Sequence, residues 1–254
     1  MWTALKLNWK PAISETPVTV EAVLPAAAHR KLRALCRYLL NCAAGVAIVM
    51  PCGFLSLGLA AAESSNRLEG RALVEALRKG GYNIYFRHAA TDWSQTDQVS
   101  MAGDWTSCDP SKMRQLSEAG RQTAGAVGEA MRTLQIPIGQ VLASPYCRTV
   151  ATARNMNLGR VETTTDIMNL RVAEYFGGSA AIAANTRRRL SILPQAATNT
   201  VLVAHGNVLV TATDVYPQEA EAIVFRPGGS GIWTFVARIS PQEWARLAAE
   251  YSDR

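Results

Sequence analysis

Apolar positions follow two different periods along the chain from residue 65 onward. Where apolar residues recur every three or four positions, the pattern predicts amphipathic helices. Four segments have this spacing: 66–79, 117–134, 146–156 and 240–251. We expect Gly80 and Gly81 to end the first of these helices, and Ser144 and Pro145 to serve as the N-cap and first helical position of the third.

Short apolar runs separate these helices and predict strands. The runs are 83–86, 140–144 and 200–206, and the last of them suits a strand that is covered on both faces. Near the C-terminus, two further runs joined by a glycine-rich turn predict a β-hairpin over 220–239. Helices and strands that alternate in this way predict an α/β fold, a three-layer α/β/α sandwich with a mainly parallel sheet.

The stretch before residue 63 has a different pattern. Residues 38–62 carry no charge, follow the basic segment 29–37 and end in three alanines, as in a secretory signal. The run exceeds a usual signal core of about 7 to 15 residues and reaches the roughly 20 that cross a bilayer, so a cleaved signal and an uncleaved anchor both stay open.

We therefore expect two parts in the chain. Residues 1–62 form an N-terminal extension plus signal peptide or membrane anchor, and residues 63–254 form the functional domain. The domain is expected in the periplasm, or outside the cytoplasm on an inner-membrane anchor that runs through residues 38–62 with its basic side inside.

The net charge of +6 is concentrated in the first part. Residues 1–62 hold six of the 26 basic and two of the 20 acidic side chains, a net +4, which leaves 20 minus 18, or +2, for residues 63–254. Because the domain is nearly neutral, we expect no nucleic-acid partner.

Cysteine and histidine placement limits the chemistry further. The domain holds Cys108 and Cys147, which an oxidising compartment could join in one disulfide, although two separate small side chains fit equally well. Its two histidines, His88 and His205, have no spaced set of carboxylates or cysteines around them, so we expect no metal site and no other cofactor.

Charged side chains follow three of the predicted strands. Arg87 and His88 follow the first, Arg148 lies just beyond the second, and His205 follows the third. The carboxyl ends of parallel strands meet at one edge of a sheet, where ligands bind. Burying several positively charged side chains together costs free energy unless an anion binds between them. The oxygens of a phosphate group match the planar guanidinium donors of arginine. The sequence therefore predicts a phosphate pocket at this edge.

Four stretches carry a family resemblance across residues 80–246. They are "RHAATDWS", "LSEAGRQTA", "VLASPYCRTVATA" and "VLVAHGN". In this order they resemble the landmarks of the histidine phosphatase superfamily, which has the phosphoglycerate-mutase-like fold. The resemblance implies a phosphomonoester hydrolase in which His88 is the nucleophile and becomes phosphorylated, while Arg87, Arg148 and His205 bind the phosphoryl group. Further substrate-binding residues implied by these stretches are Thr91, Ser94 and Gly206.

Two positions depart from the family pattern, and the candidate general acid is assigned only by its position in the sequence. Ala89 replaces the usual glycine after the Arg-His pair, and Ser94 replaces the usual asparagine. In mutase-like members a glutamate protonates the leaving oxygen, and Glu174 stands in about the right place. Asp92 is the fallback for this role, and some small members manage without a dedicated acid.

Two alternatives to the hydrolase stay open. One is a mutase-type phosphotransferase, which returns the phosphoryl group to a substrate, and the other is a non-catalytic phosphate- or phosphoprotein-binding module. In each case the expected partner is a small phosphorylated substrate or a phosphorylated protein. The pocket walls are expected from residues 92–115 and 165–195, where the sequence has no pattern that selects one ester.

Overall fold

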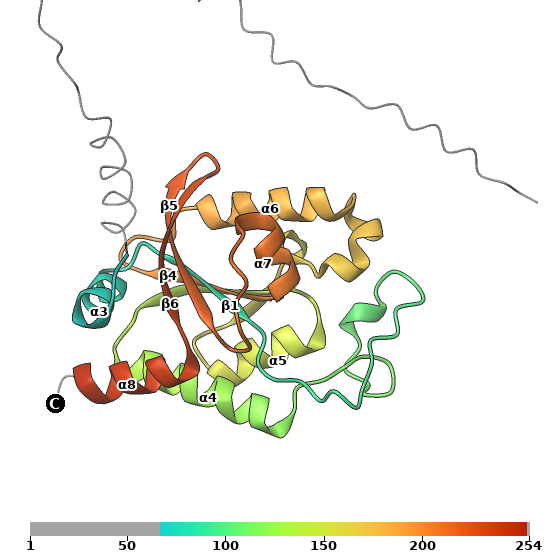
Figure 1. The fold of residues 1–254 in the computed structure, drawn as a ribbon, viewed down its shortest axis with the longest axis horizontal. Coiled ribbons are helices and arrows are strands. Elements are labelled where there is room, and N and C mark those ends of the chain that lie inside the picture. Colours follow the sequence, from blue (N-terminus) through green and yellow to red (C-terminus); the bar gives the residue numbers. More distant parts are fainter. Residues whose placement is uncertain (1–66, 253–254) are drawn as a thin grey trace, which may run out of the picture. The chain divides into compact units, whose positions relative to one another are not determined.

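The computed structural model describes residues 67–252 (Figure 1). The predicted leader, residues 1–62, and the predicted domain boundary after it lie outside the described residues, so both stay predictions. Within residues 67–252, no helix is both long enough and apolar enough to cross a membrane.

A six-stranded sheet with the order β3-β2-β4-β1-β5-β6 forms the middle of the fold. The strands are β1 Asn83–Arg87, β2 Ile138–Ala143, β3 Val161–Thr163, β4 Asn199–Ala204, β5 Ala222–Gly229 and β6 Ile232–Ile239. The first four strands run parallel, whereas β5 is antiparallel to β1 and forms a hairpin with β6. This arrangement confirms the predicted mainly parallel α/β sheet and the predicted C-terminal hairpin.

Six α-helices lie within the described residues: α3 Gly70–Lys79, α4 Glu118–Thr133, α5 Cys147–Met156, α6 Ser179–Ser191, α7 Gly206–Thr213 and α8 Pro241–Tyr251. The helices α3, α4, α5 and α8 correspond to the four predicted ones, whereas α6 and α7 were not predicted. Three short 3-10 helices connect these elements: η1 Asp104–Thr106, η2 Thr165–Ile167 and η3 Leu170–Phe176.

The predicted start of α5 was wrong. Its N-cap is Tyr146, which makes no side-chain capping bond, and the helix begins at Cys147. Ser144 does not cap the helix because its hydroxyl is engaged elsewhere, with Nε2 of His205 at 3.0 Å and with Sδ of Met168 at 3.7 Å. The serine that the pattern assigned to a helix end therefore belongs to the surroundings of a buried histidine.

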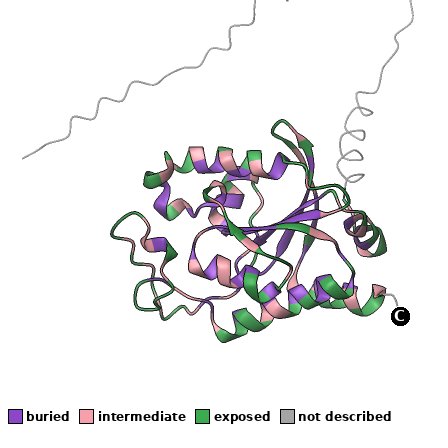
Figure 2. Ribbon diagram, turned by 180° about the vertical axis from the view of Figure 1, so that it is seen from behind, coloured by how far each residue is buried: buried purple, intermediate pink, exposed green. Residues whose placement is uncertain are grey.

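Successive side chains of each central strand enter two separate apolar cores. In β1, Ile84 and Phe86 pack with α3, α4, α5 and α8, while Tyr85 packs with α6 and α7 on the other face. Figure 2 shows buried residues along the strands and on the helix sides that face them. Because strand side chains point to alternate faces, this division produces the three-layer sandwich.

Helix α4 approaches its neighbours closely at two glycines. A Cβ on Gly128 would lie 1.8 Å from the carbonyl oxygen of Met156 in α5, and one on Gly120 would lie 2.0 Å from the carbonyl oxygen of Ala90. No larger residue fits at either position without a backbone shift. These contacts fix α5 and the segment after β1 against one common helix.

The chain leaves β1, β2 and β4 at the same edge of the sheet. Arg87 of β1 is in register with Ala204 of β4, and the ladder continues with a 2.9 Å bond from the N–H of His88 to the Ala204 carbonyl. On the other side of β4, the N–H of Ser144 donates to the carbonyl of Val203 at 3.0 Å. Residues that follow the three strands therefore converge.

Candidate active site

A pocket of about 170 Å³ opens at this edge of the sheet. Arg87, His88, Arg148 and His205 all line it, so the structure brings together the four side chains that the strand ends predicted. Two larger hollows of about 550 and 560 Å³ are lined by residues that include Arg67, Phe235 and Arg238, with no histidine among them. The site chemistry therefore lies in the smaller pocket.

His88 is buried, with 5% of its surface exposed. Its Nδ1 lies 2.9 Å from the carbonyl oxygen of Ala89. A carbonyl only accepts hydrogen bonds, so this contact places the proton on Nδ1 and leaves a lone pair on Nε2. Burial, followed by the charge of Arg148, lowers the pKa of His88 to about 3. The ring is therefore neutral at physiological pH, as a nucleophile requires.

His205 lies beside His88, with 5.6 Å between the two ring centroids. Its Nε2 contacts the hydroxyl of Ser144 at 3.0 Å, and its Nδ1 has no hydrogen-bond partner among residues 67–252. Since a serine hydroxyl can donate to Nε2, the ring can hold its proton on Nδ1 and offer it to a ligand. Burial and the charge of Arg148 also lower the pKa of His205.

Arg148 reaches the pocket from the first turn of α5 and is almost fully buried. Its Nη1 donates to Oδ1 of Asp97 at 2.9 Å, with the two side chains 2% and 3% exposed. The guanidinium carbon lies 4.5 Å from the ring centroid of Tyr146, and Nε has no hydrogen-bond partner within the described part of the chain. The charge is thus held in place with donor capacity left for an anion.

Arg87 ends β1 and extends toward the segment after α7. Its Nη1 donates to the hydroxyl of Tyr216 at 3.2 Å and to the carbonyl of Pro217 at 3.3 Å. Its Nη2 meets Glu219 at 3.5 Å. These contacts hold the second arginine at the mouth of the pocket.

Only some of the remaining predicted site residues line the pocket. Gly206 lines the pocket as the first residue of α7, where the N-terminal N–H groups of a helix favour an anion. Thr91 is buried in an isolated bridge with Leu116, and Ser94 is exposed and donates to Asp92. Glu174 is exposed on η3. None of Thr91, Ser94, Glu174 and the fallback acid Asp92 is among the lining residues.

Several lining residues were not predicted individually. They are Asp97, Arg114, Asn169, Arg171, Asn207 and Tyr216, although four of them fall in the stretches 92–115 and 165–195 that were expected to form the pocket walls. Asn207 directly follows the His205-Gly206 pair, so its position offered a signal. Asp97 and Arg114 lie in the long stretch between β1 and α4, where no apolar period marks which side chains turn inward.

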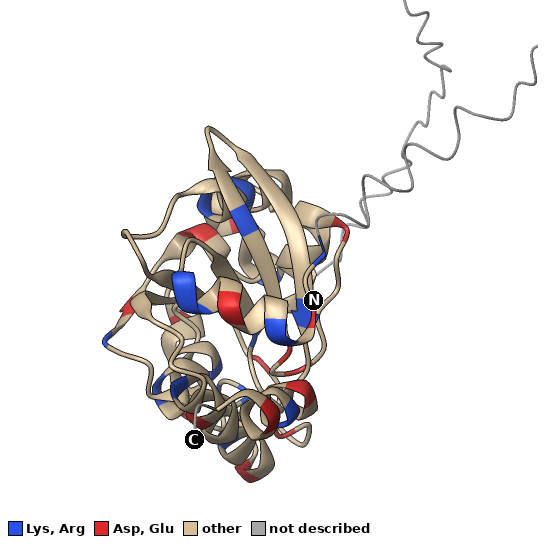
Figure 3. Ribbon diagram, turned by 90° about the vertical axis from the view of Figure 1, so that its left-hand side faces the viewer, with Lys and Arg blue, Asp and Glu red and all other residues tan. Residues whose placement is uncertain are grey.

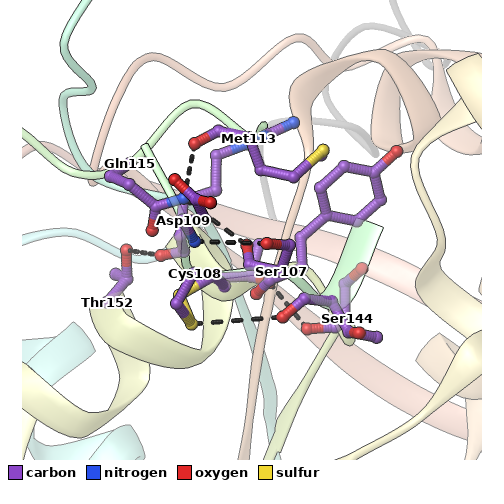
Figure 4. The surroundings of a disulfide bond; sticks show 12 residues. Ser107, Cys108, Asp109, Met113, Gln115, Ser144 and Thr152 are labelled. Atoms are coloured by element: carbon purple, nitrogen blue, oxygen red, sulfur yellow. Dashed lines mark hydrogen bonds between the residues drawn. A yellow bond between two sulfur atoms is a disulfide. The ribbon is translucent and has the colours of Figure 1, made fainter. Parts of the chain in front are cut away.

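A disulfide joins this long stretch to α5. Cys108 and Cys147 are bonded, with 5.3 Å between their Cα atoms. Figure 4 shows Asp109, Met113, Gln115, Ser144 and Thr152 around Cys108. Because Cys147 directly precedes Arg148, the disulfide fixes the segment that carries Asp97 and Arg114 beside the buried arginine. This resolves the pairing that the sequence left open.

Charge outside the pocket is mixed. Figure 3 shows basic and acidic residues interspersed along the described helices and loops. Ion pairs account for many of the basic side chains, including Arg188 and Arg189 with Asp166. Within residues 67–252, no group of three or more His, Cys, Asp or Glu side chains is placed to hold a metal ion.

Residues 84–191 match the family model of the histidine phosphatase superfamily, branch 1. The match includes Arg87, His88 and Arg148 and ends before His205, which the sheet topology brings to them. The match supports a histidine phosphatase superfamily domain over residues 84–191. The α/β fold with a mainly parallel sheet agrees with the fold class that the sequence predicted.

Solved structures to which the chain is similar include three phosphatases. The protein histidine phosphatase SixA complexed with tungstate is 15% identical, with a TM-score of 0.40 over 63% of this chain and 97% of that one. A phosphoserine phosphatase variant from Entamoeba histolytica with phosphoserine is 13% identical, with a TM-score of 0.44 over 64% and 98%. A mycobacterial glucosyl-3-phosphoglycerate phosphatase is 15% identical, with a TM-score of 0.41 over 61% and 96%. No curated protein matches the chain.

Proposed function

We propose that the protein is a phosphomonoester hydrolase that works through a phosphohistidine intermediate on His88. The observation that carries this proposal is a neutral, buried histidine in a pocket lined by arginines, with its Nδ1 proton directed to a backbone carbonyl. Such a ring has its free lone pair on Nε2, and the surrounding charges suit the anion that it would attack.

In the first step, Nε2 of His88 attacks the phosphorus of the ester. The N–P bond forms while the P–O bond to the leaving group breaks, and the electron pair of that bond stays on the leaving oxygen. Arg148 and Arg87 stabilise the phosphoryl oxygens, and His205 donates from Nδ1. In the second step, water attacks phosphorus, the N–P bond breaks and inorganic phosphate leaves.

The proton for the leaving oxygen has no dedicated donor in this scheme. The predicted acid Glu174 does not line the pocket, and the carboxylate that does, Asp97, is paired with Arg148. The leaving oxygen therefore takes its proton from water. This limits the reaction to esters whose leaving groups accept negative charge or are well hydrated.

The same observation favours a second candidate function. A pocket with four arginines, two neutral histidines and no unpaired carboxylate among its described lining residues suits a phosphate-binding module without turnover. Release of p-nitrophenol from p-nitrophenyl phosphate separates the two candidates, because a binding module releases none.

The test of the proposal compares the parent with His88→Ala in this assay. Parent hydrolysis with a loss of at least about a thousandfold in His88→Ala supports the covalent route. Equal rates in the two proteins would rule it out. Arg154→Ala, a change at an exposed arginine on α5, is the matched control and should leave the rate unchanged.

We further propose that the domain works outside the cytoplasm, in the periplasm or on an inner-membrane anchor. The Cys108–Cys147 disulfide supports this location, since disulfides persist in oxidising compartments. Fractionation of cells that express the full chain, followed by thiol alkylation, tests it. A cytoplasmic protein with both thiols free would contradict the proposal.

A further inference from the structure

Two arginines in the pocket have no carboxylate partner within residues 67–252. Arg114 and Arg171 line the same cavity as His88, yet neither forms an ion pair, whereas Arg87 meets Glu219 and Arg148 meets Asp97. Guanidinium groups that gather in one site repel one another unless an anion joins them. Two charges thus remain beyond those assigned to the reacting phosphoryl group.

Arg114 is held in a fixed position. Its backbone N–H donates to Oδ1 of Asp97 at 3.1 Å, the same oxygen that pairs with Arg148. Its guanidinium carbon lies 4.0 Å from the ring centroid of Trp93, and its Nε is buried without a hydrogen-bond partner among the described residues. The aromatic face orients the group without using its N–H donors, so they stay available for a ligand.

The charges around Arg114 favour an added anion. Burial and the charge of Arg148 lower the pKa of Arg114, the charge of Asp97 partly offsets this, and the charge of Arg171 lowers the pKa further. A negative group placed between these side chains would relieve the repulsion.

Arg171 lies at the rim of the same cavity. Its backbone N–H donates to Oδ1 of Asn169 at 3.0 Å, and that oxygen also accepts from Nδ2 of Asn207 at 2.8 Å. Asn207 is the second residue of α7, two positions after His205. The start of η3 is therefore tied to the start of α7, which keeps the exposed Arg171 near the phosphate pocket.

The size of the pocket determines where a ligand's remaining atoms lie. The volume of the pocket is about 170 Å³. It holds a phosphoryl group and few further atoms, so the rest of a substrate reaches the rim. Arg171 and Trp93, whose surface is 69% exposed, lie there beside Arg114.

We propose that Arg114 and Arg171 form a second anion subsite, and that the substrates are small phosphomonoesters carrying a further carboxylate or phosphoryl group. The inference rests on the proposed function for the placement of the first phosphoryl group at His88. Binding at the subsite needs no turnover, so it can be measured apart from catalysis.

The experiment uses the full-length protein and two phosphonates, which contain no ester bond to hydrolyse. Isothermal titration calorimetry compares phosphonoacetate, which has a second anionic group, with ethylphosphonate, which has none. The variants are Arg114→Gln and Arg171→Gln. Arg160→Gln is the matched control, because Arg160 is exposed and lines a different hollow, next to Ile138 at the start of β2.

We expect the parent to bind phosphonoacetate about 10- to 100-fold more tightly than ethylphosphonate, as suits charge-assisted hydrogen bonds. This preference should fall to less than about threefold in Arg114→Gln, decrease in Arg171→Gln and persist in Arg160→Gln. Equal affinities in the parent, no binding of either phosphonate, or a preference that survives both substitutions would overturn the inference.

The outcome is distinguishable from failure of the proposed function. p-Nitrophenyl phosphate has no second anion, so its His88-dependent hydrolysis does not involve the subsite. Hydrolysis of this ester together with equal phosphonate affinities would overturn the subsite alone. Conversely, a preference for phosphonoacetate without any hydrolysis would support the second anion subsite and contradict the proposed hydrolase activity.

Discussion

Asp97 and Arg148 form a buried ion pair inside the pocket, with 2.9 Å between Oδ1 and Nη1. Fifty-one positions separate the two residues, and the pair joins the long segment before α4 to the first turn of α5. A second bond from the Arg114 N–H reaches the same carboxylate oxygen. One carboxylate therefore orients the buried arginine and fixes the segment that covers it.

Removing this carboxylate should lower the stability of the protein and increase the stabilisation that a bound anion provides. Asp97→Ala leaves Arg148 buried without a partner, so we expect the free energy of unfolding to fall by about 3 kcal/mol. Inorganic phosphate should then raise the melting temperature of Asp97→Ala more than that of the parent, because it replaces the missing charge. Thermal unfolding with and without phosphate measures both effects. Equal phosphate responses would contradict this role of Asp97.

The disulfide should stabilise the domain and preserve the pocket. The bond spans 39 positions, and closing such a loop stabilises by about 4 kcal/mol in the chain-entropy model. We expect the double variant Cys108→Ser/Cys147→Ser to lose about 2 to 4 kcal/mol of unfolding free energy and to bind phosphonoacetate more weakly. Urea unfolding with and without a reductant measures the first effect.

The double variant also controls for the three cysteines of residues 1–62, which are Cys36, Cys42 and Cys52. Reductant should destabilise the parent and leave the double variant unchanged, since the domain holds no other cysteine. If reductant lowered the stability of both proteins equally, the effect would come from cysteines other than Cys108 and Cys147.

Arg148 should contribute chiefly to the rate of turnover. Its loss removes a fixed donor for the phosphoryl oxygens, so we expect Arg148→Ala to lower kcat by about a hundred- to a thousandfold. Initial rates with p-nitrophenyl phosphate measure this loss, with Arg154→Ala on the same helix as the control. A decrease of less than threefold would remove Arg148 from the mechanism.

Acid should destabilise the fold through the two histidines. Burial lowers the pKa of His88 to about 3, from an ordinary value near 6.5, and lowers that of His205 as well. Between these values the unfolded chain binds more protons than the folded one, so stability is present above about pH 6.5 and is lost as the pH falls toward 3. The slope is at most about 1.4 kcal/mol per pH unit for each histidine.

The window from pH 7.5 to 5.5 isolates this effect, because most carboxylates stay ionised there. Urea unfolding of the parent should show a clear fall in stability across it, and His88→Asn should show a smaller one. An unchanged dependence in the variant would mean that His88 is not held neutral by the fold.

Helices and strands with a clear pattern of apolar residues were predictable from the sequence, and those without such a pattern were not. Strand β4 is buried throughout, and the apolar run within it was predicted as a strand covered on both faces. Helix α7 contains Val208 and Val210 in a short apolar run, and β-branched residues do not favour a helix. Packing of Val208 and Leu209 in the core around Tyr85 determines its structure, which the local sequence does not encode.

The site residues also differ in whether a local sequence pattern predicts their position. Arg87 ends β1, His88 and His205 directly follow β1 and β4, and Arg148 lies in the first turn of the helix after β2. The parallel sheet therefore brings all four to one edge. Asp97 and Arg114 reach the pocket through a long segment whose path depends on the disulfide and on the pair with Arg148. Contacts between residues so far apart in the sequence follow from tertiary packing and leave no local pattern.

The most direct test of the account is to locate the phosphoryl group in the intermediate. Rapid quenching of the parent during turnover of p-nitrophenyl phosphate, followed by tandem mass spectrometry and NMR of the phosphopeptide, identifies the residue and its ring nitrogen. We expect an acid-labile phosphoryl group on Nε2 of His88, since Nδ1 donates to the Ala89 carbonyl. Hydrolysis without a phosphoenzyme, or a phosphoryl group on His205, would contradict it.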